Sequence, residues 1–119
     1  MGPFLYVKIR KINMKAIILA AGEGSRLQPL TLNTPKSLIE IGGKPILERI
    51  FDELPDQIEE VIIIVGHLKE KIKDYLGNDF KNKKVTCVEQ GSMKGTFGAL
   101  RSARDFLQEG EKFIVLNGD

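Results

Sequence analysis

The chain has 119 residues, of which 42% are hydrophobic and 29% charged, and 18 basic residues against 16 acidic ones give a formal net charge of +2. This length allows one core, and so small an excess of charge argues against nucleic-acid or membrane partners. The single cysteine, Cys87, excludes an intrachain disulfide and a cysteine-cluster metal site, which favours a reducing, cytoplasmic location.

Residues 1–13 mix apolar and basic side chains ahead of Met14. They contain no apolar stretch as long as the core of a signal peptide, and no stretch of the whole chain has the length of a membrane span. We therefore expect residues 1–13 to be a leader or an upstream-start extension, followed by one domain over residues 14–119.

Seven apolar segments alternate in type along the rest of the chain. Four are short runs typical of strands, and the first of these is apolar without alternation, as expected of a parallel strand buried on both faces. Three have apolar residues at helical spacing, and the first of these follows Pro45 directly. The predicted strands cover residues 16–20, 61–65, 84–89 and 112–117, and the predicted helices cover residues 46–54, 69–76 and 96–107.

This order of elements predicts an α/β fold, namely a doubly wound, Rossmann-like, mainly parallel sheet with helices on both faces, truncated after the fourth strand. In such sheets, ligands bind at the carboxyl ends of the strands. A glycine loop at residues 21–24, then Gly66, Gln90 and Asp119, all follow predicted strands. We therefore expect one nucleotide-sized site near the first strand. The only histidine, His67, also follows a strand and a glycine, where a capping or solvated role is expected.

The loop after the first strand has the chemistry of a phosphate site. Gly22 and Gly24 lack a Cβ atom, so the backbone can approach a ligand and present its N–H groups to anionic oxygens. Arg26 adds a planar cation, and Lys36, which follows a proline, adds a second one. A polyphosphate suits this set, whereas a glycine turn with solvated cations is the alternative. The third glycine of a dinucleotide fingerprint is absent at Leu27, and no Walker A sequence is present.

Five sequence blocks resemble those of the sugar nucleotidyltransferase family, in the same order and at plausible spacing. The blocks are LAAGEGSRLQPLT at residues 19–31, PKSL at 35–38, GKPI at 43–46, EQ followed by GTxGAL at 89–100, and LNGD at 116–119. The resemblance covers residues 14–119. Ala21 stands where many members carry glycine, and Ser25 stands where many carry threonine. Both changes are conservative for a phosphate site formed mainly by backbone N–H groups.

The resemblance implies transfer of a nucleotidyl group from a nucleoside triphosphate to a sugar 1-phosphate, which releases pyrophosphate and gives a nucleotide-sugar. By the same resemblance, Arg26 and Lys36 are the catalytic residues, and Asp119 holds Mg²⁺. Gln90 would read the base edge together with the backbone near Gly95. The implied nucleotide-binding residues are Leu19, Ala20, Ala21, Gly22, Glu23, Gly24, Ser25, Gln90, Gly95 and Thr96.

Family members continue beyond the final Gly-Asp block, into a half that supplies most sugar contacts and a second metal-binding aspartate. We therefore expect residues 14–119 to be the nucleotide-binding part of a nucleotidyltransferase domain, with weak metal binding and little turnover by themselves. A non-enzymatic nucleotide-binding or regulatory module is an alternative, as is a nucleotidyltransferase for a non-sugar phosphate such as phosphocholine. An unpaired strand edge would also allow a homo-oligomer. The base and the sugar stay open, since Gln90 can satisfy several base edges.

Overall fold

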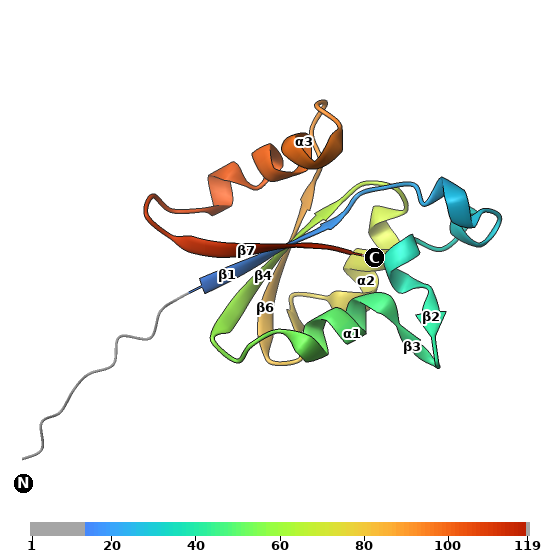
Figure 1. Ribbon diagram of the computed structural model, residues 1–119, viewed down its shortest axis with the longest axis horizontal. Coiled ribbons are helices and arrows are strands. Elements are labelled where there is room, and N and C mark those ends of the chain that lie inside the picture. Colours follow the sequence, from blue (N-terminus) through green and yellow to red (C-terminus); the bar gives the residue numbers. More distant parts are fainter. Residues whose placement is uncertain (1–13, 119) are drawn as a thin grey trace, which may run out of the picture.

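The computed structural model describes residues 14–118, so the predicted leader at residues 1–13 and the predicted metal ligand Asp119 lie outside the described residues. The centre of the fold is a five-stranded sheet with the strand order β5-β6-β4-β1-β7 (Figure 1). Its strands are β1 (Met14–Ala20), β4 (Ile58–Val65), β5 (Asp79–Phe80), β6 (Lys83–Glu89) and β7 (Lys112–Asn117). The four long strands run parallel, and the short β5 is antiparallel. The predicted mainly parallel sheet is confirmed.

Within the described residues, three α-helices cover the sheet: α1 (Ile46–Glu53), α2 (Lys69–Leu76) and α3 (Gly95–Ser102). Helices α1 and α2 pack on one face and α3 packs on the other, as predicted (Figure 1). The division follows from strand geometry, because successive side chains point to opposite faces. In β1, buried Ile18 belongs to the cluster that contains Leu47 of α1 and Ile72 of α2, whereas its buried neighbour Ile17 belongs to the cluster that contains Ala99 of α3. None of these helices is long and apolar enough to cross a membrane.

The segment between β1 and α1, where no strand or helix was predicted, is structured. It contains three short 3-10 helices and a two-stranded hairpin: η1 (Ser25–Leu27), η2 (Leu30–Leu32), η3 (Lys36–Leu38), β2 (Glu40–Ile41) and β3 (Lys44–Pro45). Gly42 and Gly43 join the hairpin strands with φ angles of +63° and +79°, the left-handed backbone that a two-residue hairpin turn requires. Single 3-10 turns are too short to leave a periodic apolar pattern, so periodicity could not predict them.

The third predicted helix, residues 96–107, is wrong at its end. Helix α3 ends at Ser102, and a separate 3-10 turn, η4 (Arg104–Phe106), follows it. The N–H of Ala103 donates to the carbonyl three residues earlier, so the chain tightens there from α-helical to 3-10 bonding. Ala103 is fully buried in the core cluster under α3. The helix therefore ends in a tighter turn at the position where Ala103 is buried in the core.

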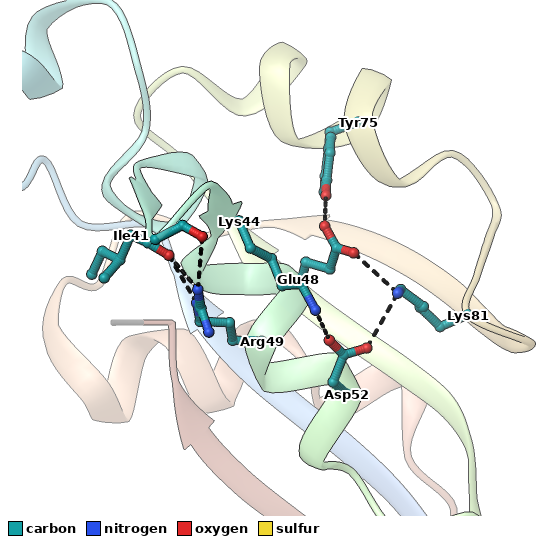
Figure 2. Close-up of polar contacts among 8 residues, drawn as sticks. Ile41, Lys44, Glu48, Arg49, Asp52, Tyr75 and Lys81 are labelled. Atoms are coloured by element: carbon teal, nitrogen blue, oxygen red, sulfur yellow. Dashed lines mark hydrogen bonds and ion pairs between the residues drawn. The ribbon is translucent and has the colours of Figure 1, made fainter.

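A polar network ties α1 to its neighbours (Figure 2). Lys81, in the turn between β5 and β6, pairs with Glu48 at 3.0 Å and with Asp52 at 3.2 Å, and both carboxylates lie on α1. Asp52 also pairs with Lys44 of β3 at 2.8 Å, and Glu48 accepts a hydrogen bond from the hydroxyl of Tyr75 on α2 at 2.9 Å. Exposed pairs of this kind each contribute about 0–1 kcal/mol. The network therefore orients neighbouring elements more than it stabilises the fold.

Candidate functional site

A pocket of about 330 Å³ opens at the carboxyl ends of β1, β6 and β7, the edge at which a parallel sheet places its ligands. Most of the predicted site residues line it, namely Leu19, Ala20, Ala21, Gly22, Gly24, Lys36, Gln90, Gly95 and Thr96. Residues that the sequence reasoning missed also line it, namely Ser37, Ala99, Asn117 and Gly118. Each missed residue lies inside one of the five sequence blocks, and membership of a block was the signal that could have identified it.

The remaining predicted residues lie elsewhere. Glu23, Ser25 and Arg26 are exposed and do not line the pocket, so the structure brings one of the two predicted catalytic cations, Lys36, to the pocket wall. Asp119 lies outside the described residues. Among residues 14–118, no group of three or more His, Cys, Asp or Glu side chains could hold a metal ion. The catalytic roles of Arg26 and Lys36, the base contact of Gln90 and the Mg²⁺ site therefore stay predictions.

The glycine loop is held in shape by contacts beneath Gly24. This residue has a φ angle of +62°, and a Cβ atom added to it would lie 2.8 Å from the Thr31 methyl group and 3.2 Å from Cβ of Lys36. The buried Thr31 hydroxyl donates to the carbonyl of Gly24 at 2.7 Å. His67 Nε2 lies 2.7 Å from the Thr31 carbonyl and, because a carbonyl only accepts, donates to it. His67 therefore supports the loop, a structural role compatible with the capping role expected for it.

Two further glycines allow the strand ends to close beneath the loop. A Cβ atom at Gly66, after β4, would lie 3.0 Å from the carbonyl oxygen of Ala21. One at Gly118, after β7, would lie 2.9 Å from the carbonyl oxygen of Leu19. The N–H of Gly118 donates to that same oxygen of Leu19 at 2.9 Å. Side chains at these positions would push the neighbouring strand ends apart, so the floor of the pocket depends on both glycines.

Gln90 forms the first part of the opposite wall. Its side-chain Nε2 donates to the carbonyls of Met93 at 3.0 Å and Gly95 at 3.2 Å. Two carbonyl partners fix the orientation of the amide, because only its nitrogen can donate. Both amide hydrogens are thereby directed to the backbone of residues 93–95, and the amide oxygen is the group that stays available to a ligand.

Ser102 ties the same loop to α3. Its hydroxyl accepts from the N–H of Gly91 at 2.9 Å and donates to the carbonyl of Gly98 at 2.9 Å, so one side chain links the loop to the helix. The approach at Gly98 is very close, since a Cβ atom there would lie 1.9 Å from the carbonyl oxygen of Met93. The wall that Gly95 and Thr96 present to the pocket is therefore built on a loop packed directly against the backbone of the helix.

Charged groups at the end of β6 pair with one another beside this wall. Glu89 pairs with Lys69 at the start of α2 and lies 3.7 Å from Lys73, and a hydrogen bond from Lys69 holds the pKa of the Glu89 carboxyl below its usual value. Burial raises the pKa of the nearby Cys87 thiol. A raised pKa leaves the thiol protonated at neutral pH, which is the form that does not act as a nucleophile.

Comparisons with known proteins find a family profile and relatives that match most of the chain. The sequence matches the profile of the nucleotidyl transferase family over residues 15–119. It is 45% identical over 106 residues to the bifunctional protein GlmU of Methanocaldococcus jannaschii, a match that covers 89% of this chain and 25% of that protein. It is 38% identical over 107 residues to the UTP–glucose-1-phosphate uridylyltransferase AglF of Haloferax volcanii, covering 89% of this chain and 43% of that protein.

A solved structure gives the same result for the fold. The CTP:phosphocholine cytidylyltransferase from Streptococcus pneumoniae superimposes with a TM-score of 0.73 at 38% identity, covering 91% of this chain and 46% of that one. This chain thus spans between a quarter and just under half of the length of these proteins. The matched residues include all five sequence blocks on which the resemblance to sugar nucleotidyltransferases was based, and that resemblance is confirmed. The chain therefore belongs to the nucleotidyl transferase family.

Proposed function

We propose that this chain provides the nucleotide-binding part of an enzyme that transfers a nucleotidyl group from a nucleoside triphosphate to a sugar 1-phosphate. The observation that carries this proposal is that the glycine loop, Lys36 and the loop of Gln90 line the same pocket. Backbone N–H groups and a cation at one end suit phosphates, and an amide oxygen at the other end suits a base. The uridylyltransferase relative, which acts on glucose 1-phosphate by its name, supports the acceptor class.

The reaction requires little covalent work from the protein. An oxygen of the sugar phosphate attacks the α-phosphorus of the nucleotide, a new P–O bond forms, and the bond to the leaving pyrophosphate breaks. Negative charge collects on the phosphate oxygens, so fixed cations and N–H groups lower the barrier. In the proposed mechanism Lys36 contacts the reacting phosphates from the pocket wall. Arg26, on the exposed η1 turn next to the glycine loop, is proposed to bind the triphosphate and the leaving pyrophosphate.

The geometry of Gln90 determines which part of its side chain can meet a base. Its amide oxygen accepts hydrogen bonds, while its amide nitrogen already donates to the carbonyls of Met93 and Gly95. Uracil, thymine and guanine present a ring N–H at the centre of their pairing edge, whereas cytosine and adenine present an acceptor nitrogen there. Cytosine and adenine, however, also carry an exocyclic amino group that donates hydrogen bonds, so an accepting amide oxygen can pair with each base and the preferred triphosphate stays open.

Mg²⁺ is part of the proposal as the cofactor, with Asp119 as its protein ligand. A hard cation suits carboxylate and phosphate oxygens, and when bound it would neutralise charge on the phosphates. The described residues add no cluster of metal-binding side chains, so one carboxylate with water and substrate oxygens would complete the coordination. The residues present in the pocket wall, Lys36 and the backbone of the glycine loop, act on the phosphates independently of the ion.

The proposal includes a location and a mode of assembly. A cytoplasmic location is supported by the single cysteine, and pairing between copies is supported by β7, an edge strand with Phe113 and Val115 exposed.

A phosphocholine acceptor is the second candidate function, because the cytidylyltransferase of Streptococcus pneumoniae is 38% identical. Binding without transfer, as in a regulatory module, is the third.

The test is calorimetric titration of the protein with Mg²⁺ and each nucleoside triphosphate. Lys36→Ala should weaken the binding of every nucleoside triphosphate, and Gln90→Ala should remove any preference among the bases. Lys112→Ala serves as the matched control. Lys112 is an exposed lysine at the amino end of β7, whereas the pocket lies at the carboxyl ends of the strands. Absence of binding to every nucleotide would refute the proposal. Turnover with glucose 1-phosphate or with phosphocholine, followed by pyrophosphate release, distinguishes the two acceptors from a module that only binds.

A further inference from the structure

Ser37 lies in the pocket wall, and its hydroxyl group makes no hydrogen bond to another group of the protein. It lies in η3 next to Lys36, lines the pocket and is 3% exposed. Its Oγ atom has no hydrogen-bond partner among the atoms of the protein, and among residues 14–118 it is the single buried side-chain nitrogen or oxygen in that condition. Most buried polar groups in folded proteins are paired, so an exception in a ligand pocket requires an explanation.

The same segment shows that a buried hydroxyl can be satisfied here. Thr31, which is 1% exposed, donates its hydroxyl hydrogen to the carbonyl of Gly24 at 2.7 Å. The Ser37 hydroxyl lies a few residues further along the chain, in a turn that packs against the same loop. An unpaired buried hydroxyl destabilises a fold, and alanine at this position would remove the penalty. Serine at position 37 is therefore not explained by the stability of the free protein.

The position of Ser37 points to a phosphate as the missing partner. The stem of the adjacent Lys36 lies close beneath Gly24, because a Cβ atom at Gly24 would lie 3.2 Å from Cβ of Lys36. Ser37 is thereby held at the end of the pocket where the glycine loop and a cation gather. A serine side chain has three staggered χ1 positions, and a rotation between them is the movement that would bring Oγ toward the pocket.

We propose that the Ser37 hydroxyl is a ligand-binding group that turns toward the pocket and donates a hydrogen bond to a phosphate oxygen of the bound nucleoside triphosphate. This inference rests on the proposed nucleotide-binding function and adds a residue to it. The hydroxyl has no partner from the protein itself and would gain one in the complex. Ser37 thus trades stability of the free fold for affinity, a pattern common at binding sites.

The test measures stability and binding on the same variants. Ser37→Ala should unfold at an equal or higher urea concentration than the wild type. Its affinity for nucleoside triphosphates should nevertheless be about tenfold lower than that of the wild type. Inorganic tripolyphosphate should lose a similar factor, because the contact is to phosphate and not to the base. Ser37→Thr keeps the hydroxyl and should retain more affinity than Ser37→Ala. Thr86→Val, which removes a hydroxyl from β6 outside the pocket, is the control and should bind as the wild type does.

Each outcome decides the inference. Weaker binding with unchanged or increased stability supports it. Wild-type affinity in Ser37→Ala overturns it and leaves the proposed function standing, since the wild type still binds. A loss of stability, or failure of Ser37→Ala to fold, also overturns it, because the hydroxyl would then have a structural partner. No binding of triphosphate or tripolyphosphate by the wild type would refute the proposed function together with this inference.

Discussion

Replacing Gly24 by alanine should destabilise the protein, whereas the same replacement at Gly22, two residues earlier, should not. Gly24 has a φ angle of +62°, and its added methyl group would lie 2.8 Å from the Thr31 methyl group. Thr31 cannot step aside easily, since it is buried and its hydroxyl is bonded to the Gly24 carbonyl. At Gly22, no atom lies within 4 Å of the added Cβ and the backbone is not left-handed.

The magnitude follows from two costs at Gly24. A left-handed backbone costs a residue with a side chain about 1–2 kcal/mol, and forcing a methyl group into a packed site costs about 1–3 kcal/mol. Because the loop can shift and relieve part of this strain, we expect Gly24→Ala to lose about 2 kcal/mol of unfolding free energy. With a urea dependence near 2 kcal/mol per molar, the unfolding midpoint should fall by about 1 M. Gly22→Ala should be unchanged or up to about 1 kcal/mol more stable, because alanine restricts the unfolded chain.

The assay is equilibrium urea unfolding, with nucleotide titration on the same samples. Gly24→Ala should lose both stability and affinity, since the loop must move. Gly22→Ala should keep its stability, and any loss of affinity would then report the close approach of a ligand to the loop backbone. Equal stability of the two variants would refute the reasoning, because it would mean that the conformation of Gly24 and its contact with Thr31 do not constrain the loop.

Three other changes give sharp expectations. Gly98→Ala should lose about 3 kcal/mol of unfolding free energy and weaken nucleotide binding, because the new methyl group would lie 1.9 Å from the Met93 carbonyl oxygen. Lys83→Met should also lose about 3 kcal/mol in urea unfolding, since this buried lysine donates at 3.1 Å to the carbonyl of Pro55, between α1 and β4, and at 2.6 Å to that of Ile58, at the start of β4, and both would be left unpaired. Burial and a hydrogen bond to Glu48 raise the pKa of Tyr75 to about 12. Its contribution to stability is therefore complete below pH 10 and lost as the pH rises toward 12, a loss that Tyr75→Phe should abolish in unfolding measured across that range.

The contrary outcomes are equally specific. Wild-type stability in Gly98→Ala would mean that the loop packs less closely on α3 than the structure places it. A Lys83→Met protein as stable as the wild type would show that water replaces the ammonium group at the two carbonyls. An identical alkaline decline in Tyr75→Phe and wild type would assign the decline to other groups, such as the lysines on the surface.

The elements of the fold were largely predictable because their signals are local. An uninterrupted apolar run such as residues 61–65 predicts a buried parallel strand, and apolar residues at helical spacing predicted α1 and α2 closely. The errors occurred where the signal depends on distant contacts. Helix α3 ends earlier than its apolar spacing indicates, at the point where Ala103 enters the core, and the 3-10 turns around residues 25–38 carry no period of their own.

The sequence by itself determined the alternation of strands and helices, the edge of the sheet at which a site would form, and the residue types suited to phosphate binding. These follow from hydrophobic periodicity, from the geometry of parallel sheets and from the chemistry of glycine and lysine. Only the tertiary structure decided that Lys36 lines the pocket while Arg26 stays outside it, that the amide nitrogen of Gln90 is bonded to its own loop, and that the hydroxyl of Ser37 has no partner. The physical reason is that hydrogen-bond partners and burial arise between segments far apart in the chain, where no local pattern records them.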